Sequence, residues 1–218
     1  MSGAGLQVRG LRLDRDGRRL LDVDALDVPA GACTVLAGEG DSGKTLLAAA
    51  LGGMAGATGD VRLGTRRLAG PPSQRIRAGL AAVPNDPTRL RGVSVVEALA
   101  LAATRGARDG SAVRRAVSDV FDRFSLLAAR RSLRAERLSG GEHQALRIAC
   151  AWVASPDVLV LDSPTTGLAA SVVDAVLALA RDEAARGAAV LWLDQPAAPL
   201  PAAATLRIAG GRVSAPPG

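Results

Sequence analysis

Residues 32–45, ACTVLAGEGDSGKT, decide the fold. The run 32–38 is short and mostly apolar, as expected of a buried parallel strand. A glycine-rich turn follows it, and residues 45–54 then have helix-forming composition. A buried strand, a glycine-rich turn and a helix in this order are the context that a phosphate-binding loop requires.

The turn itself matches the phosphate-loop pattern GxxxxGK[ST]. Its residues are Gly38, Glu39, Gly40, Asp41, Ser42, Gly43, Lys44 and Thr45. Glycines let backbone N–H groups point inward at an anion, and the helix that follows presents its positive end to phosphates. The pattern predicts that Lys44 reaches the β- and γ-phosphates and that Thr45 ligates Mg²⁺. Lys44 is the only lysine of a chain that otherwise uses arginine, which indicates a role that arginine cannot fill.

Two carboxylates bear on this prediction. Asp41 lies inside the loop, where a negative charge should repel phosphate, so we expect its side chain to point outward. Asp162 ends the hydrophobic run LVLD and is expected to be the carboxylate on the Mg²⁺ side. The alternative for Asp162 is an ordinary strand end, because many buried strands finish in Asp.

The rest of the chain alternates strands and helices, which indicates an α/β fold with a mostly parallel sheet. Residues 6–13 and 20–28 resemble strands, and 156–162 and 188–194 resemble buried strands. Residues 94–103 and 111–127 are amphipathic at helical spacing, so residues 94–140 are expected to form an inserted helical lobe. Residues 205–214 are expected to form a hairpin around Gly210-Gly211.

Composition excludes several classes of protein. The 218 residues suit one domain with a small lobe, and 48% hydrophobic residues exclude a disordered chain. With 2% aromatic residues, a binder of single strands by base stacking is excluded. No window of about 18 consecutive apolar residues exists, so no membrane span is expected. The net charge of +6 decides little, because nearly all of it is arginine in a chain rich in Ala and Gly.

The pentapeptide LSGGE, residues 138–142, lies between the lysine loop and LVLD. Together the three motifs resemble the ATP-binding subunit of ATP-binding cassette (ABC) transporters, over essentially the whole chain. The resemblance implies a P-loop NTPase core with an N-terminal antiparallel β subdomain and an inserted helical subdomain. It places the core at about 1–85 and 141–218 and the helical insertion at 86–140. Residues 138–169 are most similar to the branched-chain amino-acid importer group.

The resemblance also implies a head-to-tail dimer. ATP would lie between the Lys44 loop of one subunit and Ser139, Gly140 and Gly141 of the other, with Mg²⁺ held by Thr45, Asp162 and Asn85. The implied partners are transmembrane permease subunits and a second ABC ATP-binding subunit, in a homodimer or a heterodimer, and no nucleic acid. The implied location is cytoplasmic, peripheral at the inner face of the cell membrane.

The chain departs from the family at the catalytic positions Asn85, Ser163 and Gln195, and at Ala169. Ser163 stands where the family has its catalytic Glu, and a hydroxyl is a poor base at neutral pH. Losing a general base removes about 10²–10⁴ in rate, so slow hydrolysis at the chain's own loop is expected. Asp194 is a conceivable substitute base, but capping of its strand end is the favoured role.

The expected function is therefore an ATP-binding, transport-coupling subunit. A non-transport ABC regulator and a scaffold that no longer binds ATP are the alternatives. His143, the only histidine, is expected to be exposed or bonded across the dimer. The arginines at 130, 131, 134 and 137 recur at helical spacing and are expected to form a solvated face, with a nucleic-acid stripe and contact to a membrane-subunit loop as the alternatives.

Overall fold

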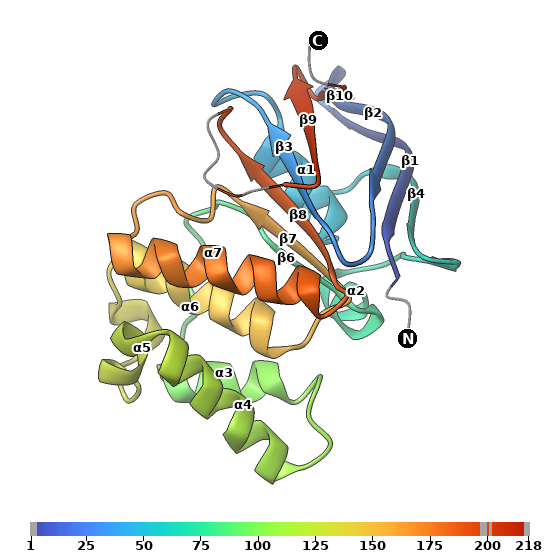
Figure 1. The fold of residues 1–218 in the computed structure, drawn as a ribbon. Coiled ribbons are helices and arrows are strands. Elements are labelled where there is room, and N and C mark those ends of the chain that lie inside the picture. Colours follow the sequence, from blue (N-terminus) through green and yellow to red (C-terminus); the bar gives the residue numbers. More distant parts are fainter. Residues whose placement is uncertain (1–3, 197–199, 201, 216–218) are drawn as a thin grey trace. The chain divides into compact units, whose positions relative to one another are not determined.

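The computed structural model describes residues 4–196, 200 and 202–215 (Figure 1). Its contacts divide the chain into two compact units. The first contains residues 1–85, 157–164 and 180–218, and the second contains 86–156 and 165–179. By contacts, residues 141–156 therefore group with the inserted helices, whereas the sequence places them in the core. The domain limits at 86 and 141 stay a prediction, because a contact grouping does not define a domain.

The first unit contains an antiparallel sheet of order β2-β1-β4-β5. Its strands are β1 (Leu6–Arg15), β2 (Arg18–Val28), β4 (Thr58–Leu63) and β5 (Arg66–Arg67). Buried and exposed residues alternate along β1, so one face packs on the core and the other meets solvent. Asp16 and Gly17 join β1 to β2 with positive φ values of 51° and 72°. The expected N-terminal antiparallel strands are confirmed.

The second sheet of this unit has the order β10-β9-β3-β8-β7-β6. Its strands are β3 (Cys33–Ala37), β6 (Leu80–Val83), β7 (Val158–Asp162), β8 (Ala189–Asp194), β9 (Ala204–Ala209) and β10 (Arg212–Ser214). All neighbours are parallel except the β9–β10 hairpin, which confirms the mostly parallel sheet. Every residue of β3, β7 and β8 is buried, so these strands have continuous apolar runs instead of alternation.

The register of the parallel strands sets up one functional edge. Ala37 at the end of β3 pairs with Asp194 at the end of β8. Asp162 at the end of β7 pairs with Leu193 of β8. The loop after β3 and the two carboxylates that end β7 and β8 therefore share the carboxyl edge of one sheet, where open α/β sheets bind their ligands.

Two helices belong wholly to the first unit. Helix α1 (Lys44–Leu51) starts directly after the glycine-rich turn and packs against β6 and β7. It stops three residues before the expected end, because Gly52 and Gly53 follow. Helix α2 (Pro72–Ala78) was not predicted: it buries no residue, so the sequence has no apolar period there. Pro72 suits its first turn, where no N–H is needed.

The second unit is helical. It contains α3 (Val95–Ala103), α4 (Gly110–Arg123), α5 (Ser125–Ala129), a 3₁₀ turn (Ala135–Arg137) and α6 (Gly140–Val153). Helix α7 (Ala170–Ala185) runs from this unit into the first. Ser94 and Asp109 cap α3 and α4 with side-chain oxygens. The expected helical stretch 111–127 is broken at Phe124, whose φ of −117° and ψ of 77° are not helical.

The predicted solvated face of four arginines is confirmed, because all four residues are exposed. Their helical spacing does not come from one helix. Arg130 follows α5, and Arg131 and Arg134 lie in the segment that connects α5 to the 3₁₀ turn. Arg137 ends the 3₁₀ turn. Turns and short 3₁₀ segments can therefore repeat charges at intervals similar to those of an α-helix. In the part of the chain that the structure describes, no helix has the length and apolarity needed to cross a membrane.

Candidate functional site

The loop between β3 and α1 contains three glycines, and a side chain would be excluded or tolerated at each of them for a different structural reason. Gly43 has φ 103°, a left-handed conformation that other residues rarely adopt. A Cβ on Gly38 would come within 2.5 Å of the Ile208 carbonyl oxygen. A Cβ on Gly40 would meet nothing within 4 Å. The chain's own packing therefore explains Gly38 and Gly43, whereas the open space at Gly40 is available to a ligand.

Lys44 is the buried charge of this loop. The residue is 5% exposed. Its Nζ donates hydrogen bonds to the carbonyl oxygens of Gly38 and Glu39, both at 2.6 Å, and to the Ser42 hydroxyl at 3.2 Å. All three acceptors are neutral, and among the described residues no carboxylate pairs with this ammonium. A buried cation without a counter-ion is costly, so the arrangement favours an anion at the loop.

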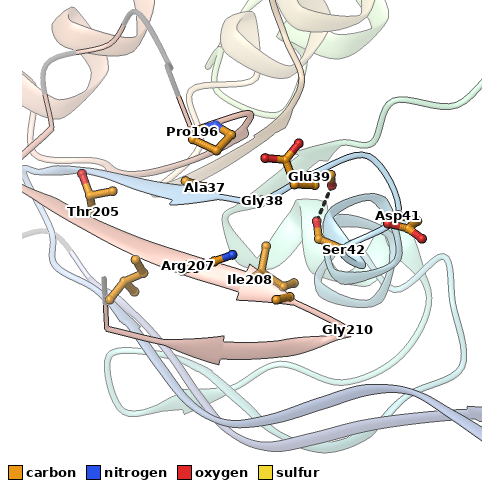
Figure 2. A pocket seen from close by; sticks show the side chains of 12 residues that line it. Ala37, Gly38, Glu39, Asp41, Ser42, Pro196, Thr205, Arg207, Ile208 and Gly210 are labelled. Carbon is orange, nitrogen blue, oxygen red and sulfur yellow. Dashed lines mark hydrogen bonds between the residues drawn. The ribbon is translucent and has the colours of Figure 1, made fainter. Parts of the chain in front are cut away.

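A cavity of about 420 Å³ adjoins the loop on its β9 side (Figure 2). Gly38, Glu39 and Ser42 line it from the loop, and residues 205–210 line it from β9 and the turn after it. In Figure 2 the Ser42 hydroxyl donates to the Glu39 carbonyl oxygen, at 2.7 Å. Lys44 and Thr45 do not line this cavity, so it is not the face on which the lysine would meet phosphate. Asp41 is exposed.

The structure brings Asp162 together with Asn85 and Ser163. The Asp162 carboxylate is fully buried. Its Oδ2 accepts the Asn85 backbone N–H at 2.9 Å, and its Oδ1 accepts the Ser163 hydroxyl at 3.3 Å. The Asn85 residue itself is exposed. Ser163 therefore uses its proton to hold a neighbouring carboxylate, and nothing in this arrangement makes it a base.

The residues after β8 show a capping arrangement. Asp194 is 8% exposed, and its two oxygens accept Nε1–H of Trp192 at 2.9 Å and the Gln195 backbone N–H at 2.8 Å. Both oxygens are thus engaged by the strand and its immediate continuation, which supports the capping role over that of a base. Gln195 is exposed at the same edge of the sheet.

Only a few protein oxygen atoms at this edge of the sheet could ligate Mg²⁺. The described residues contain no cluster of three His, Cys, Asp or Glu side chains that could hold a metal alone. Mg²⁺ bound with a nucleotide takes one or two protein oxygens and completes its shell with phosphates and water. The exposed Thr45 hydroxyl at the start of α1 and the Asp162 carboxylate supply oxygens of the required kind. This donor set fits a nucleotide-borne Mg²⁺ and not a protein-only metal cage.

Ser139, Gly140 and Gly141 lie in the second unit, at the start of α6. Ser139 Oγ accepts the Glu142 N–H at 3.2 Å, and Glu142 Oε2 accepts the Ser139 N–H at 2.9 Å, which forms a capping box. Among the described residues the Ser139 hydroxyl acts only as an acceptor, so its proton is still available to a ligand. A Cβ on Gly141 would lie 2.6 Å from the Gly167 carbonyl oxygen, whereas a Cβ on Gly140 would meet nothing within 4 Å.

This difference gives a prediction for stability. We expect Gly141→Ala to lower the free energy of unfolding by about 1–3 kcal/mol, because the new methyl group collides with backbone. Gly140→Ala should change it by less than about 1 kcal/mol, in the stabilising direction, since alanine favours the helix. Urea unfolding of the two variants checks this. Equal stability of the two variants would contradict the packing described here.

The prediction that His143 is exposed is wrong. His143 is 5% exposed, and its Nε2 accepts the Leu90 backbone N–H at 2.9 Å. Burial lowers the pKa of this imidazole below its ordinary value, and the nearby cations Arg147 and Arg89 lower it further. The missed signal was the spacing of His143 and Arg147, which are four residues apart and so share one face of α6.

Comparisons with known proteins agree with this geometry. The family model of the ABC transporter matches residues 21–166. The high-affinity branched-chain amino acid transport ATP-binding protein BraG of Pseudomonas aeruginosa is 31% identical over 173 residues, 78% of this chain and 73% of that protein. The probable branched-chain amino acid transport ATP-binding protein LivF of Archaeoglobus fulgidus is 34% identical over 151 residues, 68% of this chain and 63% of that protein.

Among solved structures, an ATP binding subunit of an ABC transporter is similar with a TM-score of 0.85 and 26% identity. The match covers 96% of this chain and 88% of that one. The resemblance to ABC ATP-binding subunits, and to the branched-chain amino-acid group in particular, is confirmed by these relatives. The chain belongs to the ABC transporter family.

Proposed function

We propose that this chain is the ATP-binding subunit of an ABC transporter. It binds Mg-ATP between its own Lys44 loop and the Ser139–Gly141 turn of a second cassette, and it acts on a separate membrane permease. The observation that carries the proposal is the buried Lys44 ammonium at the start of a helix, whose hydrogen-bond partners within the described ranges are all neutral. A triphosphate supplies the missing negative charge, and the loop amides and the positive end of α1 attract the same charge.

Around the bound nucleotide each residue has a distinct task. Lys44 contacts the β- and γ-phosphates, and the open space at Gly40 lets the phosphate chain approach the backbone. Thr45 and Asp162 hold Mg²⁺ with the help of Asn85, whose N–H already fixes Asp162. When bound, Mg²⁺ neutralises phosphate charge.

The second contact is made in trans. The Ser139 hydroxyl and the free N–H groups at the start of α6 are donors suited to a γ-phosphate. A Cβ on Gly140 would contact nothing in the part of the chain that the structure describes. The glycine therefore leaves space for a group from outside the chain, which supports contact with the partner's nucleotide. The dimer thus closes with nucleotide between the two cassettes, and the permease is moved by this closure.

Hydrolysis at the chain's own loop is slow in this proposal. Ser163 stands in the position of the base and donates its proton to Asp162. In a heterodimer such a chain would still support hydrolysis. Its Ser139–Gly141 turn would complete the nucleotide site of a partner that keeps the catalytic Glu. The chain then binds at the cytoplasmic face of a membrane through its permease, and the site that contains Ser163 is the structural half of the dimer.

Light scattering in Mg-ATP tests the proposed dimer. We expect the wild-type chain to associate with a second copy or with a second, different ABC ATP-binding subunit. Gly140→Arg should prevent association, because a Cβ at residue 140 meets nothing of the described chain within 4 Å, so the long side chain would fill the space that the partner's nucleotide needs. Gly140→Ala is the matched control and should still associate. A mass that Mg-ATP leaves unchanged in both mixtures, or equal association of Gly140→Arg, would contradict the dimer.

A further inference from the structure

Gly211, in the turn between β9 and β10, bonds to the phosphate loop through its backbone. Its N–H donates to the Ser42 carbonyl oxygen at 2.8 Å, and its own carbonyl oxygen accepts the Asp22 N–H of β2 at 2.9 Å. Figure 2 shows Ser42 of the loop and Gly210 of the turn at the same end of the β9–β10 hairpin. All of these residues belong to the first unit. Gly211 therefore joins β2 to the loop, although it belongs to none of the three motifs.

Close packing leaves no room for a side chain at residue 211. A Cβ there would lie 2.1 Å from the Leu20 carbonyl oxygen of β2. On the loop side, a Cβ on Gly43 would lie 3.1 Å from the Gly211 Cα. The two turn glycines differ in this respect. Both have left-handed φ values, 53° for Gly210 and 76° for Gly211, but a Cβ on Gly210 would meet nothing of the described chain within 4 Å.

The bond to Ser42 fixes the orientation of one peptide group in the loop. The Ser42 carbonyl and the Gly43 N–H belong to the same planar trans peptide, so they point in opposite directions. Because the turn holds the carbonyl, the Gly43 N–H points away from Gly211. This N–H has no hydrogen-bond partner among the described residues, and Gly43 is only partly exposed. Folded chains rarely leave such a donor unpaired, so an acceptor from outside the chain is expected there.

The serine held by the turn also contacts the lysine. Ser42 is 4% exposed. Its hydroxyl donates to the Glu39 carbonyl oxygen at 2.7 Å and accepts a hydrogen bond from Lys44 Nζ at 3.2 Å. A displacement of Ser42 would therefore disturb the ammonium as well as the Gly43 amide.

We propose that Gly211 is a positioning residue for nucleotide binding: the β9–β10 turn holds the Ser42–Gly43 peptide so that the Gly43 N–H donates to a phosphate oxygen. This inference rests on the proposed function and adds a requirement to it, because the loop then needs the hairpin as a support. β2 completes the support by bonding to Gly211 from the other side. A loop whose amide is already oriented loses less conformational freedom on binding, and such preorganisation raises affinity.

Alanine substitutions at the two turn glycines give the first test. Gly211→Ala should weaken Mg-ATP binding about tenfold or more, because the methyl group collides with the Leu20 carbonyl and displaces the turn from Ser42. Gly210→Ala is the matched control. Its φ is also left-handed, but its methyl group meets nothing of the described chain, so it should bind Mg-ATP like the wild type. Titration calorimetry measures both affinities, on proteins that circular dichroism shows to be folded.

An ester tests the hydrogen bond itself, because the alanine methyl group can also disturb the fold. Glycolic acid in place of Gly211, inserted by nonsense suppression in cell-free synthesis, replaces the N–H by an oxygen and keeps the shape of the turn. This oxygen cannot donate to the Ser42 carbonyl, so the affinity for Mg-ATP should fall about tenfold. Glycolic acid in place of Gly210 is the matched control, because no hydrogen bond of the described chain uses that N–H.

The Gly43 amide provides a readout that a merely structural glycine at 211 would not move. Serine labelled at its carbonyl carbon and glycine labelled at its nitrogen together mark only the serine–glycine peptides, those of Gly3, Gly43 and Gly140. Gly3→Ala and Gly140→Ala each remove one signal and so identify the third. Saturating Mg-ATP should move the Gly43 amide proton downfield in the wild type, because an anionic oxygen is a strong acceptor. The ester at 211 should reduce this shift.

The outcomes separate the two proposals. If the folded wild-type chain does not bind Mg-ATP, the proposed function and this inference both fail. If it binds, but the ester at 211 binds as tightly or both esters weaken binding equally, the inference alone is wrong. A Gly43 amide proton that saturating Mg-ATP leaves in place in the wild type also overturns the inference, and this measurement does not depend on how any variant folds.

Discussion

Lys44→Ala should weaken Mg-ATP binding by about 100-fold or more, which we expect to be the largest effect of any single substitution in the chain. The side chain is buried, and its ammonium has no counter-ion among the described residues, so a triphosphate is the partner that would complete the site. Removing the Lys44 side chain would leave the phosphate charge at the loop without its nearest cation. Titration calorimetry with Mg-ATP measures the change.

Two controls make this result specific. Arg62→Ala removes one positive charge from β4, where it pairs with Asp60 at 2.6 Å, and should leave Mg-ATP affinity unchanged. Lys44→Arg keeps the charge, but its planar guanidinium cannot place a compact ammonium between two carbonyls, so binding should stay weak. If Lys44→Ala binds Mg-ATP as tightly as the wild type, the lysine loop is not the phosphate site.

Ser163→Glu should raise the ATP turnover of the purified chain by about 10²–10⁴, the usual contribution of a general base. Ser163 follows Asp162 at the carboxyl edge, where a carboxylate could activate water beside a nucleotide held by Lys44. Its φ of 48° is left-handed, and neither Ser nor Glu is β-branched, so the exchange of Ser for Glu adds little backbone cost. Steady-state release of phosphate, at nucleotide saturation, measures the gain.

Ser163→Gln is the matched control, because it has nearly the size of Glu and no basic oxygen. It should stay as slow as the wild type. The wild-type chain alone should hydrolyse ATP far more slowly than the roughly 1–10³ s⁻¹ typical of enzymes. Wild-type turnover in that range, or equal gains from Glu and Gln, would show that Ser163 does not limit hydrolysis.

The sequence predicted the features that depend on local pattern. Continuous apolar runs identified β3, β7 and β8, and the spacing of glycines and lysine identified the loop, because phosphate binding fixes both residue type and interval. Helix α2 was missed, since it buries nothing and so has no periodic signal. The break at Phe124 was missed because the apolar spacing continues across it.

The contacts made by individual polar side chains could not be predicted. His143 was expected at the surface, yet it accepts a backbone N–H from residue 90, which lies 53 positions away. The bond between Asn85 and Asp162 spans 77 positions. Such pairs depend on how distant segments pack, whereas a motif records only its own residues. The predicted metal, nucleotide and catalytic roles of Asn85, Ser163 and Gln195 stay predictions that the variants above address.

Equilibrium binding of Mg-ATP to the wild-type chain tests the central claim most directly. Titration calorimetry at neutral pH should give saturable binding of one nucleotide per chain, and omission of Mg²⁺ should weaken it. Saturable binding that Lys44→Ala abolishes and Arg62→Ala leaves intact is the predicted result. No detectable binding by a wild-type chain that is demonstrably folded would contradict the account.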